Sequence, residues 1–125
     1  MGRVLLADLT TKELDAVLKT PSESGVVPRL KFVRKELDES LAEIRKRGWA
    51  MSDEQLSFGI RSIAAPVSDA SGRTIAAVNV TVNAAETSIA VLKKDHLPLL
   101  LSTAESITAD FSNMALLPTT RPLAP

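Results

Sequence analysis

Three small polar residues, Ser62, Asn79 and Thr81, are the side chains whose types and spacing best suit ligand binding. Hydroxyl and amide groups both donate and accept hydrogen bonds without carrying charge, and such groups orient a small molecule in a pocket. Asn79 and Thr81 are two residues apart, a spacing that places both side chains on one face of a strand. The sequence therefore predicts a binding site on a sheet built from residues 59–83.

His96 is the one histidine of the chain, and it follows Asp95, a pair that suits an oriented general base. The pair lies beside Pro98 at an expected helix junction, with no nucleophile at a recognisable spacing. The chain has no cysteine, which excludes disulfides, thiolate catalysis and thiolate metal ligands. We therefore predict no enzyme activity, no catalytic residue, no metal site and no cofactor.

Two strands, over residues 60–68 and 73–83, are expected to position the polar residues. The link Asp69-Ala70-Ser71-Gly72 between them has the composition of a hairpin turn. Gly72 suits a backbone with positive φ in that turn. A further short strand is expected at Trp49–Ser52.

The register of this hairpin decides which side chains share a face. A tight turn that pairs the residues flanking it sets Ser62 opposite Asn79 and Ile60 opposite Thr81, all on one face. A bulge would change that arrangement. Ala64 and other small apolar residues lie on the same face and indicate that the face is covered. Two interpretations stay open, a small-molecule pocket and a polar face that meets only water.

Composition limits the class of protein. The chain has 125 residues, which is the size of one domain, and its 15 basic and 15 acidic residues leave no net charge to attract nucleic acid. Aromatic residues make up 3%, too few for base stacking. No apolar run approaches the ~20 residues of a membrane span, so a cytoplasmic protein is expected.

Helical periodicity and capping signals predict the remaining elements. Thr10 and Glu13 form a capping box, and Gly48 is placed to end a helix. The basic excess before Gly48 is interpreted as a solvated helix face rather than a nucleic-acid site. Residues 118–125, with three prolines, are expected to be a disordered tail after a domain over 1–117. The expected helices cover residues 10–21, 33–47, 88–94 and 98–115.

An apolar stripe follows the last of these helices. Most of this stripe is interpreted as packing against the sheet. The rest of it could contact another subunit. The stripe consists of Leu97, Leu100, Leu101, Ala104, Ile107, Thr108, Phe111 and Met114.

The central blocks of the sequence resemble the effector-binding, C-terminal domain of IclR-family transcription regulators. The resemblance covers residues 2–115 and is most specific in the central Gly-Ile-Arg-Ser-Ile-Ala-Ala-Pro block. Details around Asn79 and Leu97-Pro98 are closer to the regulators of the β-ketoadipate pathway, which respond to hydroxybenzoate, protocatechuate or β-ketoadipate-like acids, so an aromatic or dicarboxylic acid is expected as the ligand. The residues that carry the resemblance are Gly2–Ala7, Gly48–Met51, Asp53-Glu54, Gly59–Val67, Asp69, Gly72, Ala76–Val80 and Leu97-Pro98.

This resemblance implies an α+β, GAF-like fold: an antiparallel sheet packed with helices, with a small organic acid on one face. In relatives that sense glyoxylate or pyruvate, the polar contacts come from positions that align with Ser52, Ser62, Asn79 and Thr81. The apolar lining would include Ile60, Ala64 and Trp49, and the backbone around Gly2 would close the pocket.

The resemblance also implies partners. A family regulator forms a homo-oligomer, a dimer or tetramer, and contacts DNA through a winged helix-turn-helix that this sequence lacks. About three strands are expected where the family sheet has about six, which suggests a domain truncated at its N-terminus with an unpaired sheet edge. The expected function is ligand sensing, and the alternative is an oligomerisation module without its own ligand.

Overall fold

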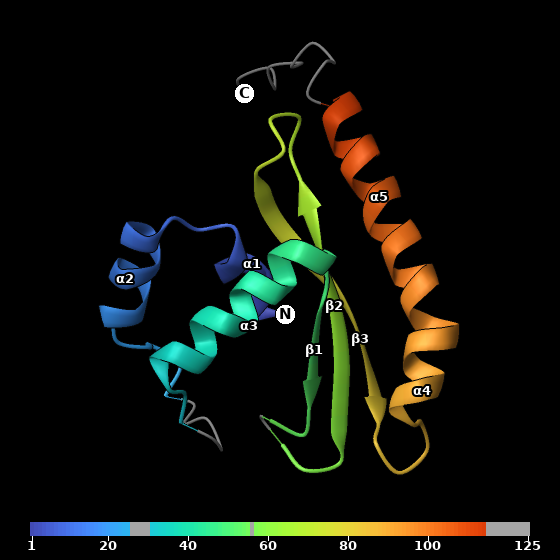
Figure 1. Cartoon of the computed structure of the whole chain (residues 1–125). Helices are drawn as coiled ribbons and strands as arrows, with labels where there is room; N and C mark the ends of the chain where they lie inside the picture. The colour runs from blue at the N-terminus through green and yellow to red at the C-terminus, as the bar shows by residue number, and fades with distance from the viewer. Residues whose placement is uncertain (26–30, 56, 115–125) are drawn as a thin grey trace, which may run out of the picture.

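The structure is a computed structural model that describes residues 1–25, 31–55 and 57–114. A three-stranded antiparallel sheet in the order β1-β2-β3 forms its middle layer (Figure 1). Helices α1 to α3 lie on one side of this sheet, and α4 and α5 lie on the other. The α+β class with an antiparallel sheet is confirmed. The elements are α1 (Gly2–Ala7), α2 (Thr11–Lys19), α3 (Arg34–Arg47), β1 (Ala50–Asp53), β2 (Ile60–Ser68), β3 (Thr74–Asn83), α4 (Ile89–Val91) and α5 (Leu97–Met114).

Capping signals in the sequence set the start of α2 and the end of α3. The Thr10 hydroxyl accepts a hydrogen bond from the Glu13 amide at 3.2 Å, and the Thr10 amide donates to the Glu13 carboxylate at 3.0 Å. This is the capping box that the sequence predicted. Helix α3 ends at Gly48, whose φ of 83° lies in the left-handed region. Its amide donates to the Ile44 carbonyl at 2.7 Å, which closes the last turn of the helix.

Replacing Gly48 with alanine is expected to lower the free energy of unfolding by about 1 kcal/mol, because an L side chain is strained at positive φ. A Cβ at Gly48 would meet no atom within 4 Å, so the loss is one of backbone conformation alone. Gly2→Ala is the matched control, since Gly2 is helical and equally open, and it should be neutral or stabilising. Urea unfolding of both variants measures the difference, and equal stabilities would contradict this account.

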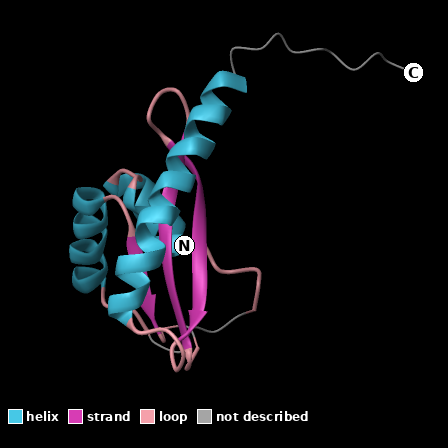
Figure 2. Ribbon diagram, turned by 90° about the vertical axis from the view of Figure 1, so that its right-hand side faces the viewer, coloured by secondary structure: helices cyan, strands magenta, loops and turns pink. Residues whose placement is uncertain are grey.

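The C-terminal helical segments are continuous, where the sequence predicted two separate helices. A π-helical turn, Leu92–His96, joins α4 directly to α5. A π-helical turn contains one more residue than an α-helical turn, and this wider turn lets α4 continue into α5. A pattern read with the 3.6-residue period of an α-helix does not predict such a turn. Pro98 is the second residue of α5, in the first turn as predicted. Helix α5 then crosses in front of the strands when it is viewed from its own side (Figure 2).

The turn between β2 and β3 has the predicted residues but not the predicted register. Gly72 has a φ of 85°, and the Ser71 hydroxyl donates to the Asp69 carboxylate at 2.6 Å, which holds the pKa of that carboxyl below its usual value. A bulge between Val67 and Ser68 shifts the strand pairing by one residue. The turn itself pairs Ser68 with Thr74 rather than with Arg73, which is an error of one residue. With the bulge added, the predicted pairing is wrong by two residues from Val67 to Ile60.

The core is divided between the two faces of the sheet. One cluster packs under the N-terminal helices and consists of Val4, Ala7, Leu14, Leu37, Leu41, Ile44, Ala50 and Ala64. The other packs under α5 and consists of Ile63, Ala65, Leu92, Leu100 and Ala104. Among the described residues, no helix is long and apolar enough to cross a membrane. The predicted tail at 118–125 lies outside those residues.

Candidate functional site

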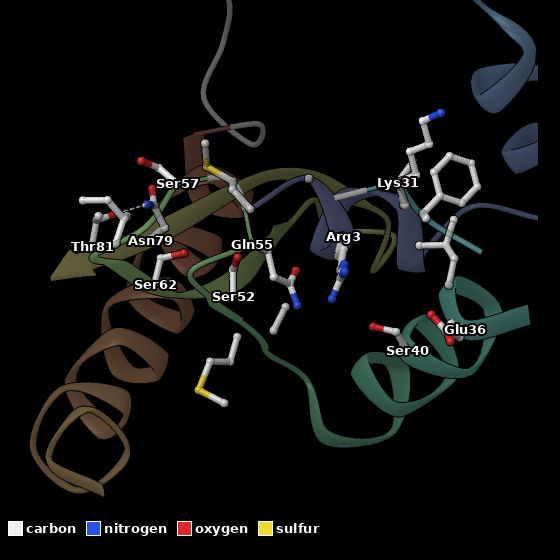
Figure 3. A pocket seen from close by; sticks show the side chains of 18 of the residues that line it. Arg3, Lys31, Glu36, Ser40, Ser52, Gln55, Ser57, Ser62, Asn79 and Thr81 are labelled. Carbon is white, nitrogen blue, oxygen red and sulfur yellow. Dashed lines mark hydrogen bonds between the residues drawn. The ribbon is translucent and has the colours of Figure 1, made fainter. Parts of the chain in front are cut away.

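A row of three hydroxyl groups crosses the sheet on the face that the N-terminal helices cover. Ser52 in β1 pairs with Ser62 in β2, and Ser62 pairs with Thr81 in β3. Directly paired residues of antiparallel strands point to the same face with Cβ atoms about 4.5–5.5 Å apart. Asn79 lies on this face two residues from Thr81, and its side-chain amide donates to the Thr81 hydroxyl at 3.0 Å (Figure 3). The four residues therefore form one polar group.

The register error leaves this grouping intact. The predicted partner of Ser62 was Asn79, whereas the structure pairs Ser62 with Thr81 and Asn79 with Ala64. A shift of two residues keeps every side chain on its original face, because side chains alternate with a period of two. Ile60, predicted opposite Thr81, pairs instead with Asn83. The shared face was predicted correctly, although the individual pairs were wrong.

A cavity of about 1050 Å³ lies between this polar row and the N-terminal helices. Strands β1 to β3 form its floor, and α1, α3 and the segment before α3 form its walls. The cavity favours the pocket interpretation over a polar face that meets only water. Gly2, Ser52, Ile60, Ser62, Asn79 and Thr81 all line it, together with Met1, Arg3, Leu6, Leu18, Lys31, Phe32, Val33, Glu36, Leu37, Ser40, Ala50, Met51, Gln55 and Ser57.

Positive charge reaches the cavity from Arg3, which the sequence reading did not identify as a site residue. Arg3 is half-buried on α1 and projects into the space between the strands and α3 (Figure 3). Two contacts hold the end of α1 in place: Arg45 donates to the Ala7 carbonyl at 2.6 Å, and Asp8 accepts from the Thr74 amide at 2.8 Å. The only signal for Arg3 was its place in the Gly2–Ala7 block of the family resemblance.

Two predicted lining residues do not line the cavity. Trp49 lies on the opposite face of the sheet and packs against the α5 cluster, because alternation along β1 separates it from Ala50 and Ser52. The Arg47 guanidinium stacks on its ring at 3.9 Å from the centroid. Ala64 faces the correct side but is 1% exposed within the N-terminal cluster. Neither side chain lines the cavity, so the ligand contacts proposed below do not include Trp49 or Ala64.

The histidine considered as a general base lies away from this cavity. His96 ends the π-helical turn beside α5, on the other side of the sheet. In the ranges that the structure describes, no three His, Cys, Asp or Glu side chains are grouped to hold a metal ion. The cavity is thus lined by neutral hydrogen-bonding groups, apolar side chains, the half-buried Arg3 guanidinium, and the charged residues Lys31 and Glu36 near the start of α3. This set suits recognition of a polar organic molecule.

Comparison with known proteins matches this architecture. A family model described as bacterial transcriptional regulator IclR, C-terminal, matches residues 1–109. The Pca regulon regulatory protein of Pseudomonas putida is 32% identical over 107 residues, which are 86% of this chain and 37% of that protein. The chain spans between about a quarter and two fifths of the curated relatives it matches.

Two crystal structures show the same fold at appreciable identity. A transcriptional regulator from Rhodococcus sp. RHA1 has a TM-score of 0.80 and 41% identity, over 90% of this chain and 45% of that one. The inducer-binding domain of the transcription factor PobR from Acinetobacter, a double mutant in complex with 3-hydroxybenzoic acid, has a TM-score of 0.75 and 28% identity. That match covers 86% of this chain and 61% of the PobR domain. These proteins are transcription regulators rather than enzymes, in agreement with the prediction.

Proposed function

Because this chain belongs to the IclR C-terminal family of bacterial transcriptional regulators, we propose that it senses a small organic acid for its regulator. The cavity beneath α1 and α3 is the ligand site, and Ser52, Ser62, Asn79 and Thr81 hold the polar groups of the ligand. The observation that carries this proposal is the hydroxyl row on the floor of a 1050 Å³ cavity that Arg3 also lines.

The chemistry of the lining favours an aromatic or dicarboxylic acid. Apolar side chains such as Leu6, Leu18 and Ile60 suit a ring or a short carbon chain, while Arg3 suits a carboxylate. The hydroxyls of Ser62 and Thr81 suit a phenol or carbonyl oxygen. The 3-hydroxybenzoic acid in the related PobR domain has both kinds of group, which supports a hydroxybenzoate, protocatechuate or β-ketoadipate as ligand.

Binding would control DNA through the winged helix-turn-helix of the regulator. A ligand shifts a regulator between two states by no more than the difference in its affinity for them. A ligand in the cavity would add contacts between α1 and the sheet to the existing hydrogen bond between Asp8 and Thr74, and this difference in contacts would distinguish the two states.

The direct experiment is calorimetric titration of the 125-residue chain with these acids. At least one should bind, and Asn79→Ala should weaken it roughly threefold to tenfold, because one neutral hydrogen bond contributes about 0.5–1.5 kcal/mol. Asn113→Ala is the matched control, since this exposed amide lies on α5 and remote from the cavity. A folded chain that binds none of the acids would contradict the proposal.

An oligomerisation module without its own ligand is the second candidate. The exposure of Ile107 and Phe111 on α5 favours it, because large apolar side chains are seldom left in a row on a helix surface. Light scattering with and without the acids separates the two functions. Association that ignores every acid, in a chain that binds none, would support this second candidate.

A further inference from the structure

The charged side chains that line the cavity are not spread evenly along it. Lys31 and Glu36 lie at the end formed by the start of α3, whereas the hydroxyl row and Asn79 at the opposite end are neutral (Figure 3). Arg3 lies between the two ends. The lining side chains together carry two positive charges and one negative charge, which leaves a single positive charge. A lining of this kind balances one carboxylate rather than two.

Glu36 supplies the negative charge of this lining. It lies in the first turn of α3, where its neighbours Asp38 and Glu39 form ion pairs with Arg34 and Lys35. Within the parts of the chain that the structure describes, Glu36 has no ion pair of its own. Its side chain is exposed, so solvent weakens the charge without removing it. The charge of Glu36 therefore acts on any group that enters this end of the cavity.

Lys31 does not offset Glu36 at this end. Figure 3 shows the Lys31 amine extending away from α3 and from Arg3, whereas the Glu36 carboxylate lies beside Ser40 on the part of α3 that borders the cavity. Lys31 is also exposed, and fixing its long side chain against a ligand would cost conformational entropy. The space between Arg3 and α3 therefore repels a second carboxylate more than it attracts one.

We propose that Glu36 makes the cavity selective for acids with one carboxylate over acids with two. This inference rests on the proposed ligand site and narrows its ligand class to a monocarboxylic aromatic acid. With one carboxylate at Arg3 and a hydroxyl at the hydroxyl row, the second carboxylate of a diacid has two places left. At the row it would find hydrogen bonds but no opposite charge, and at the α3 end it would face Glu36. Both places weaken the binding of a diacid.

Calorimetric titration of the whole chain with a matched pair of acids tests this selectivity. 3-Hydroxybenzoate has one carboxylate, and 5-hydroxyisophthalate is the same molecule with a second one. Wild type should prefer the monoacid, and Glu36→Gln should reduce that preference about fivefold, the factor for two like charges about 4 Å apart in water. Glu43→Gln is the matched control and should leave the preference unchanged. It removes the same charge from an exposed position about 10 Å further along α3 that does not line the cavity.

An uncharged analogue of the diacid gives a second test that needs no variant. 3-Carbamoyl-5-hydroxybenzoate has nearly the size of 5-hydroxyisophthalate, but an amide replaces its second carboxylate. Wild type should bind this amide about fivefold more tightly than the diacid at low salt, where charges are least screened. Equal affinities would show that size rather than charge limits the binding of the diacid, and would overturn the proposal.

The results separate this inference from the proposed function. If both acids bind and Glu36→Gln leaves the ratio of their affinities as it is in wild type, Glu36 does not set the selectivity and the inference is wrong, although the ligand site stands. If neither acid binds the folded chain, the ligand site as proposed is wrong and the inference fails with it.

Discussion

Ile63→Ala is expected to lower the free energy of unfolding by roughly 2–5 kcal/mol, the usual loss for a large side chain removed from a core. Ile63 is 0% exposed on the central strand β2, where it packs with Leu92 and Leu100 beneath α5. Domains of this size are stable by only about 5–15 kcal/mol, so the variant is expected to lose a large share of its stability.

Ile60→Ala on the same strand is the matched control for this variant. Ile60 is 45% exposed and lines the cavity, so its truncation should cost about 1 kcal/mol or less. Urea titration followed by Trp49 fluorescence measures both variants, because this single tryptophan packs against the α5 cluster. Similar losses of unfolding free energy in Ile60→Ala and Ile63→Ala would mean that α5 does not bury the face of β2 that carries Ile63.

Arg3→Ala is expected to weaken binding of an organic acid about tenfold to a hundredfold, since a hydrogen bond to a charged group contributes about 1.5–3 kcal/mol. The neutral amide of the same ligand should bind wild type and variant alike, because it has no carboxylate for Arg3 to neutralise. Arg3→Lys should retain part of the affinity, as lysine keeps the charge but not the fork of donors.

Calorimetry with 3-hydroxybenzoate and 3-hydroxybenzamide makes this comparison. Lys46→Ala is the control, since it removes one positive charge from an exposed position of α3 that does not line the cavity. Its effect should be small at physiological salt, where charges beyond about 8 Å are largely screened. Equal losses for Arg3→Ala and Lys46→Ala would assign the effect to net charge rather than to contact in the cavity.

Elements fixed by local chemistry were predictable from the sequence. The capping box at Thr10 and the positive φ at Gly48 and Gly72 depend on neighbouring residues alone, and the structure has all three. The face shared by Ser62 and Thr81 was also predictable, because strand alternation survives an even shift in register.

Features that depend on tertiary packing were not predictable in this way. The register depends on the bulge between Val67 and Ser68 and on a turn that is one residue longer than expected. The residue types at these positions do not predict the bulge. Arg3 reaches the cavity because α1 docks against a strand more than 60 residues later through the contact between Asp8 and Thr74. Trp49 was included in the lining by the resemblance alone. Within the predicted short strand it lies three residues from Ser52, so alternation places the two side chains on opposite faces, as the structure shows.

Strand β3 has two different faces, and this has a thermodynamic consequence. Asn79 and Thr81 point into the cavity, whereas Val78 and Val80 between them point toward α5. One strand thus belongs at once to the proposed ligand site and to the core beneath α5. A ligand that binds only the folded chain stabilises it by about 2.7 kcal/mol at a free concentration about one hundred times its Kd. Because both faces belong to one strand, this stabilisation extends to the packing of α5 on the sheet, and the melting temperature of the whole chain should rise with the concentration of the acid.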